Sequence, residues 1–185
     1  MSKAHANARI QKDIMRLLMA GYRVETTDNL NTVYVYFNGP EDTCYHGYQF
    51  KIRLEFPPSY PYKSPSVGFE TKIYHCNVDL SSGSICLDVL SQNWSSVFNL
   101  NHVFDTFLQQ LLLYPNPSDP LNGEAARLYM KSKEDFHKKA RSYADQHAFR
   151  IGKEHVKKVE ANSVDFDHPA KCSNVDDFSD VSDEE

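Results

Sequence analysis

Two stretches of the chain alternate apolar and polar residues, and this pattern constrains the fold more than any other feature of the sequence. The stretches are 33–37 and 50–56, in which every second residue is Val, Phe, Ile or Leu. Alternation with a period of two is typical of a β-strand that buries one face and exposes the other. With shorter strands expected at 22–25 and 67–69, the pattern predicts a four-stranded antiparallel meander that packs one face on helices.

Helical spacing of apolar residues precedes these strands and returns after them. The expected helices cover about 10–18, 100–112, 122–130 and 132–152. Gly21 is a stop signal for the first helix, and Ser132 is the N-cap of the last. The broad apolar face of the second predicted helix indicates a central, buried position.

Length and charge indicate one folded domain with an appendage. A chain of 185 residues that is 41% hydrophobic can bury one sizeable core. We expect an α+β domain over 1–160 and an acidic, disordered tail over 161–185, where apolar residues are few. The formal charge is −5, of which −7 falls on residues 162–185, so the rest of the chain carries about +2. Because a nucleic-acid-binding domain concentrates basic charge, we expect no nucleic-acid partner.

The sequence contains no run of 18 apolar residues and no apolar segment near Met1. This pattern predicts a cytoplasmic or nuclear protein without a membrane partner. The four cysteines, Cys44, Cys76, Cys86 and Cys172, show no paired C-x-x-C spacing. We therefore expect reduced thiols and no metal site.

Two irregular segments follow the predicted strands. Four of the nine prolines fall in 56–65, which excludes a helix or a central strand and predicts a rigid loop. The stretch 71–99 has poor periodicity but is rich in Gly, Ser, Asn, His and Cys. Long irregular segments in compact domains are usually functional, so we place the chemistry there, around Cys86.

Five short motifs occur in a fixed order within residues 5–150. They are Tyr60–Pro65, His75–Asn77, Gly83–Asp88, Trp94 and Pro115–Leu121. Together they resemble the ubiquitin-conjugating enzyme (E2) family. The resemblance implies the UBC fold: an N-terminal helix, a four-stranded antiparallel meander, an active-site loop and three C-terminal helices. Cys76 stands where the family usually has proline, and Trp94 lacks the proline that often follows two positions later.

The resemblance also implies roles for individual residues. Cys86 would accept ubiquitin as a thioester from the ATP-dependent activating enzyme, E1, and pass it to a substrate lysine with a ligase, E3. Asn77 would donate to the tetrahedral oxyanion or simply hold the loop. Asp119 would orient and deprotonate the lysine, or only begin a helix. His75 would brace the loop. The lysine approach would be shaped by Tyr114, Asn116 and Leu121.

Partner surfaces are implied in the same way. The expected E1- and E3-binding residues are Arg9, Lys12, Arg16, Tyr62, Lys63, Val97 and Phe98. Within the family, the acidic tail and the 87–89 and 111–123 segments resemble the H-type branch that works with the GID/CTLH ligase. Ser179 and Ser182 are candidate phosphorylation sites in that tail, whose alternative role is only to keep the protein soluble. No cofactor is implied, since ATP is used upstream by E1.

Three alternatives accompany the main interpretation, which is ubiquitination of proteins that feeds their degradation. The chain could be an E2 for another ubiquitin-like modifier, since a few surface residues decide that choice. It could be an inactive E2-like binding module, although such variants lack the cysteine that is present here. A cysteine hydrolase would need Cys86, His75 and Asp119 as a triad, but the motif order does not resemble that class.

Overall fold

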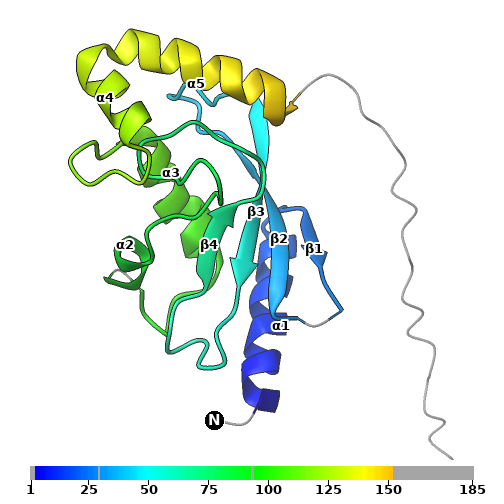
Figure 1. Ribbon diagram of the computed structural model, residues 1–185. Coiled ribbons are helices and arrows are strands. Elements are labelled where there is room, and N and C mark those ends of the chain that lie inside the picture. The colour runs from blue at the N-terminus through cyan, green and yellow to red at the C-terminus, as the bar shows by residue number, and fades with distance from the viewer. Residues whose placement is uncertain (1–2, 29, 93, 152–185) are drawn as a thin grey trace, which may run out of the picture. The chain divides into compact units, whose positions relative to one another are not determined.

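The computed structural model describes residues 3–28, 30–92 and 94–151 (Figure 1). Its helices are α1 (Lys3–Met19), α2 (Leu87–Gln92), the π-helix η1 (Val103–Phe107), α3 (Leu108–Leu113), α4 (Gly123–Lys131) and α5 (Lys133–His147). Its strands are β1 (Val24–Thr26), β2 (Thr32–Asn38), β3 (Tyr48–Glu55), β4 (Ser66–Phe69) and β5 (Phe149–Arg150). The predicted boundary at 160/161, the acidic tail, Ser179 and Ser182 lie outside the described residues.

The predicted meander is confirmed. Strands β1 to β4 are antiparallel and lie in chain order. Val35 is opposite Ile52, and Leu54 is opposite Val67, so the apolar residues of neighbouring strands share one face. All four of these side chains are buried, as the alternating pattern requires.

Helices cover the apolar face of the sheet. Helix α1 lies beside β1 (Figure 1) and adds Ile10, Ile14 and Leu17 to the core. From η1, the ring of Phe104 approaches that of Phe37 on β2, with 6.3 Å between centroids. The helix that the apolar spacing predicts at 100–112 is thus central and buried, but its first part is π-helical.

Three local features differ from the sequence-based expectations. Helix α2 lies inside the stretch expected to be irregular, directly after Cys86. Helix α5 ends at His147, which is earlier than the predicted end near 152. The chain then forms β5, which pairs with the start of β3 through Tyr48 opposite Arg150. The α5 helix stops here because this pairing, together with the Arg150–Asp145 ion pair, holds the chain extended beside the sheet.

Candidate active site

Gly83 fixes the path of the chain just before Cys86. Its φ is +71°, in the left-handed region that favours glycine. A Cβ at this position would lie 1.9 Å from the carbonyl oxygen of Phe69, so no larger residue fits. The Gly83 carbonyl accepts a hydrogen bond from the Phe69 amide at 2.8 Å, which ties the segment to the end of β4.

Two isolated β-bridges continue this attachment up to the sulfur. Ser84 is bridged to Gly68 of β4, and Ile85 is bridged to Val78. Cys86 follows at once and precedes α2, and its side chain is partly exposed. The thiol is therefore held by backbone contacts on its N-terminal side and remains accessible.

A groove of about 640 Å³ runs past Cys86. One wall comes from the segment 98–111 and includes Phe98 and His102, while the other comes from the loop that contains Asn116 and Asp119. A second hollow of about 410 Å³ is lined by more polar residues of β3 and β4, such as Arg53 and Ser66. The groove and the hollow share Ile85, Cys86 and Leu121, so the sulfur can be approached from both.

Asn77 connects the two loops of the site. Its Nδ2 donates to the carbonyl oxygens of Asn116 at 2.8 Å and Asp119 at 3.1 Å, and its Oδ1 accepts from the Asn116 amide at 2.8 Å. Asn77 also lines the groove, although only 9% of its surface is exposed. The side chain therefore holds the loop in this state, and to meet an oxyanion Nδ2 would have to release or share one of its carbonyl partners.

His75 is fully buried. Its Nδ1 accepts from the backbone amide of Asn77 at 3.1 Å, and its Nε2 has no well-formed hydrogen bond among the described residues, although the Leu111 backbone is near it. Burial lowers the pKa of His75 to about 4, so the ring is neutral at physiological pH. It is not among the groove residues, which disfavours the hydrolase triad of Cys86, His75 and Asp119.

Asp119 and the residues expected to shape the lysine approach surround the groove near Cys86. The Asp119 side chain is exposed, and no hydrogen bond to it is found within the described part of the chain. Tyr114 is 70% exposed, Leu121 is 42% exposed, and Asn116 accepts from the Ser118 amide through its side chain. The structure thus brings together Cys86, Asn77 and Asp119, the three residues expected to be catalytic.

Cys76 belongs to the core rather than to the groove. Its side chain is fully buried, and burial raises the pKa of its thiol to about 11. Its carbonyl oxygen accepts from the amides of Leu121 and Asn122, at 3.0 and 2.9 Å. A free cysteine packs like a small apolar side chain, which suits this fully buried position.

The residues expected to bind E1 and E3 divide into an exposed group and a partly buried group. Tyr62 and Val97 are 67% and 80% exposed, and Lys12 and Lys63 are exposed as well. Arg9 instead turns inward, where it pairs with Asp13 at 2.6 Å. The remaining two, Arg16 and Phe98, are partly buried.

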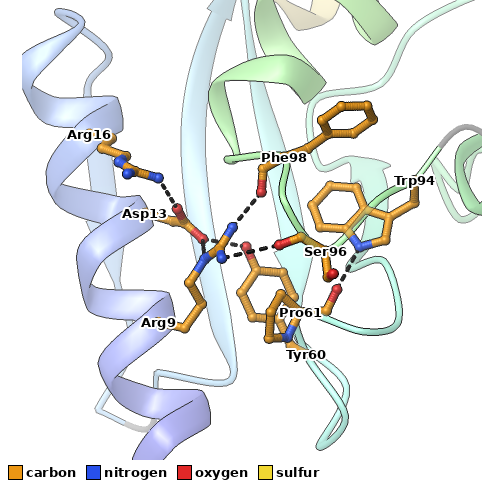
Figure 2. A network of polar contacts seen from close by, with 8 residues as sticks. All are labelled: Arg9, Asp13, Arg16, Tyr60, Pro61, Trp94, Ser96 and Phe98. Atoms are coloured by element: carbon orange, nitrogen blue, oxygen red, sulfur yellow. Dashed lines mark hydrogen bonds and ion pairs between the residues drawn. The ribbon is translucent and has the colours of Figure 1, made fainter.

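Asp13 is a buried residue of the first helix that the sequence-based expectations do not include. Its carboxylate is fully buried and also accepts from the hydroxyl of Tyr60 at 2.6 Å (Figure 2). The helical spacing contained the signal, because Asp13 lies three residues after Ile10 and four before Leu17, on the apolar face.

No group of three His, Cys, Asp or Glu side chains among the described residues is arranged to hold a metal ion. None of the helices that the structure describes is both long enough and apolar enough to span a membrane.

Comparisons with known proteins agree with this fold. The family model for "Ubiquitin-conjugating enzyme" matches residues 9–144. Ubiquitin-conjugating enzyme E2 5 of Arabidopsis thaliana is 55% identical over 141 residues, which are 76% of each chain. Ubiquitin-conjugating enzyme E2-24 kDa of Saccharomyces cerevisiae is 43% identical over 76% of this chain and 65% of its own. The E2 domain of a Toxoplasma gondii ubiquitin conjugating enzyme superposes with a TM-score of 0.71 at 28% identity, covering 77% of this chain and 99% of that one.

The fold and these similarities define an enzyme with the UBC fold. The chain belongs to the ubiquitin-conjugating enzyme (E2) family. As an E2 it interacts with ubiquitin, with an E1 and with an E3.

Proposed function

We propose that Cys86 is the residue that carries ubiquitin. Its sulfur attacks the carbonyl carbon of the E1–ubiquitin thioester, and the new S–C bond forms as the E1 sulfur leaves as a thiolate. A lysine amine then attacks the same carbon and loses its proton, while the C–N bond forms and the Cys86 thiolate departs. The observation that carries this proposal is an accessible thiol at the meeting point of the groove and the hollow.

The groove supplies a place for the tail of the donor ubiquitin. An extended peptide whose last carbonyl carbon is bonded to Cys86 needs a channel that reaches the sulfur, and the groove of about 640 Å³ is lined in part by Cys86. Its walls combine apolar side chains with the amides of Gln110 and Asn116, which can satisfy a peptide backbone. The smaller hollow leaves a second route to the sulfur, open to the acceptor.

Charge stabilisation and proton removal are assigned to Asn77 and Asp119. Asn77 Nδ2 is held by two carbonyl oxygens beside the groove, so a shift toward the sulfur would let it donate to the oxyanion. The exposed carboxylate of Asp119 is available to orient the lysine ammonium and to accept its proton. Tyr114, Asn116 and Leu121 shape the path of that lysine.

The test uses the full-length protein with E1, ATP and ubiquitin, compared on reducing and non-reducing gels. The wild type should give an adduct that reductant removes, and Cys86→Ala should give none. Cys76→Ala is the matched control, because it removes a thiol that is buried outside the groove. An adduct that persists in Cys86→Ala would overturn the assignment. Repeating the assay with other ubiquitin-like modifiers tests the alternative cargo.

The oxyanion role of Asn77 needs a separate measurement. Asn77→Ala removes three hydrogen bonds and so affects the loop as well as the chemistry. If Nδ2 meets the oxyanion, discharge of pre-formed thioester to free lysine should slow by about 10²–10³-fold. If the side chain only holds the loop, charging by E1 and discharge should fall together and by a smaller factor.

We infer further that the ligase is of the GID/CTLH type and that the enzyme works in the cytoplasm, the nucleus or both. The support is the sequence resemblance to the H-type branch, including the acidic residues of 161–185. That segment would dock on a basic surface, and phosphate on Ser179 or Ser182 would strengthen the contact. Deleting 161–185 should lower product yield with that ligase but not discharge to free lysine. Unchanged yield would refute the docking role.

A further inference from the structure

A buried carboxylate joins α1 to two loops (Figure 2). Asp13 is fully buried and receives Arg9 Nε at 2.6 Å, Arg16 Nη1 at 3.3 Å and the Tyr60 hydroxyl at 2.6 Å. Tyr60 belongs to the proline-rich loop. The next carbonyl, that of Pro61, accepts from Trp94 Nε1 at 2.8 Å. The network therefore fixes the proline-rich loop and the start of the 94–98 segment relative to α1.

Arg9 extends this network to the far end of the same segment. Its Nη1 donates to the carbonyl oxygen of Ser96 at 3.1 Å, and its Nη2 donates to that of Phe98. Three nitrogens of one guanidinium thus bind one carboxylate and two carbonyl oxygens. Only the planar guanidinium of arginine can make all three contacts at once. A lysine could keep the ion pair with Asp13 but not both carbonyl contacts.

The side chain of Phe98 links this network to the groove. Its ring lies 4.4 Å from that of His102, centroid to centroid, and both side chains line the groove beside Cys86. The carbonyl that Arg9 holds therefore belongs to a residue whose side chain forms part of the groove wall. A substitution of Arg9 would therefore displace the part of the groove wall that Phe98 forms.

We propose that Arg9 is a positioning residue for the transfer step: by holding the carbonyl oxygens of Ser96 and Phe98 it sets the groove wall against the ubiquitin tail. The inference rests on the proposed use of the groove by the donor tail. Arg9 does not touch the reacting atoms, so its effect must pass through Phe98. The two carbonyl contacts, rather than the charge of Arg9 alone, are what the transfer step requires.

The test measures single-turnover discharge of the Cys86–ubiquitin thioester to free lysine, after charging with E1 and quenching E1. Only charged molecules are followed, so a change in E1 binding does not enter the rate. Arg9→Lys is the main variant, because it keeps the charge next to Asp13 and should fold. Its maximal discharge rate should fall roughly tenfold, with the lysine KM unchanged, since small misplacements of a reacting group are costly.

Arg23→Gln is the matched control. It also removes a guanidinium–carboxylate pair, that with Glu25, but on β1 instead of at the 94–98 segment. Discharge by this variant should equal that of the wild type. A fall in Arg9→Lys that merely tracks a lower unfolding midpoint, and disappears at lower temperature, would overturn the proposal.

A double-variant cycle identifies the route of the effect. Phe98→Ala should slow discharge, and adding Arg9→Lys to it should slow discharge no further. Full additivity, or normal discharge by Arg9→Lys beside a slow Phe98→Ala, overturns the positioning role while leaving the groove assignment intact. Normal discharge by Phe98→Ala overturns the use of this groove wall itself. Absence of any thioester on Cys86 would instead overturn the proposed function.

Discussion

Two aspartates of this protein lie in opposite settings. Asp13 is fully buried and has two arginines and a tyrosine hydroxyl as partners. Asp119 lies at the edge of the groove with its side chain exposed. The first carboxylate is entirely engaged in holding loops together, whereas the second remains available to an incoming group.

Two cysteines show the same contrast between a buried and an accessible setting. Cys76 is buried, with a pKa of about 11, but Cys86, ten positions later, is partly exposed beside the groove. The buried Asp13 and His75 bind loop residues, whereas Asp119 and Cys86 are accessible beside the groove. For the proposed transfer from Cys86, this separation leaves the acceptor side of the site open while buried groups hold the surrounding loops.

The largest expected effect follows from removing the buried carboxylate. Asp13→Ala removes the carboxylate partner of Arg9 Nε and the acceptor of the Tyr60 hydroxyl, at a cost of about 3–5 kcal/mol of folding free energy. For a chain of this size the unfolding midpoint should fall by roughly 10 °C. Asp119→Ala is the control and should change stability by less than about 0.5 kcal/mol. Equal midpoints in the two variants would contradict the comparison.

The second prediction concerns His75 and pH. Its pKa is about 4 in the folded protein because of burial, against about 6.5 when unfolded. The unfolded state therefore binds more protons below pH 6.5, and stability should be lost as pH falls from about 6.5 to about 4, by about 3 kcal/mol in total. His75→Asn keeps an acceptor for the Asn77 amide but does not titrate. Urea unfolding between about pH 6.5 and pH 4 should show that the variant loses less folding free energy than the wild type. Equal losses in the two proteins would refute the role of His75.

Third, Asp119→Ala should slow discharge of the thioester to free lysine by about 10²-fold, the lower end for a proton-transfer group, because the carboxylate is exposed. Asp119→Asn should be nearly as slow if the charge is what matters. Raising the pH should recover part of the rate, since more of the lysine is then already deprotonated. A variant with normal discharge near neutral pH would remove Asp119 from the site.

The smallest effect is expected at Cys76. Cys76→Ala removes a buried sulfur and should cost about 1 kcal/mol of stability, with a normal yield of thioester. In the native wild type, iodoacetamide should modify Cys86 well before Cys76, because burial and the raised pKa both protect the latter. Mass spectrometry of the digested protein would check this order, and simultaneous modification would contradict it.

Sequence patterns predicted the parts of the fold that burial determines. The alternation at 50–56 identifies β3 because Phe50, Ile52 and Leu54 must all point into the core. Strand β5 carries no such pattern, since Phe149 and Arg150 are both exposed and their pairing depends on residues about a hundred positions earlier. The π-helical turn of η1 is likewise invisible, because its apolar spacing matches an ordinary helix.

The candidate site shows a similar limit. The motifs pointed to Cys86, Asn77 and Asp119 as candidates, but they did not predict the hydrogen bonds by which the Asn77 side chain holds the neighbouring loop. These three hydrogen bonds reach residues 39 and 42 positions away, and such contacts leave no trace in local sequence. The helical spacing places Asp13 on the apolar face, but its partner Tyr60 is 47 positions distant and could not be predicted in the same way.

Gly83 also matters for protein engineering. A library intended to change which acceptors reach the sulfur would naturally randomise the residues just before it. Ser81, Ser82 and Ser84 are exposed. At Gly83, in contrast, any side chain would collide with the Phe69 carbonyl and lift the segment from β4. A useful library therefore keeps Gly83 constant and varies only the residues around it.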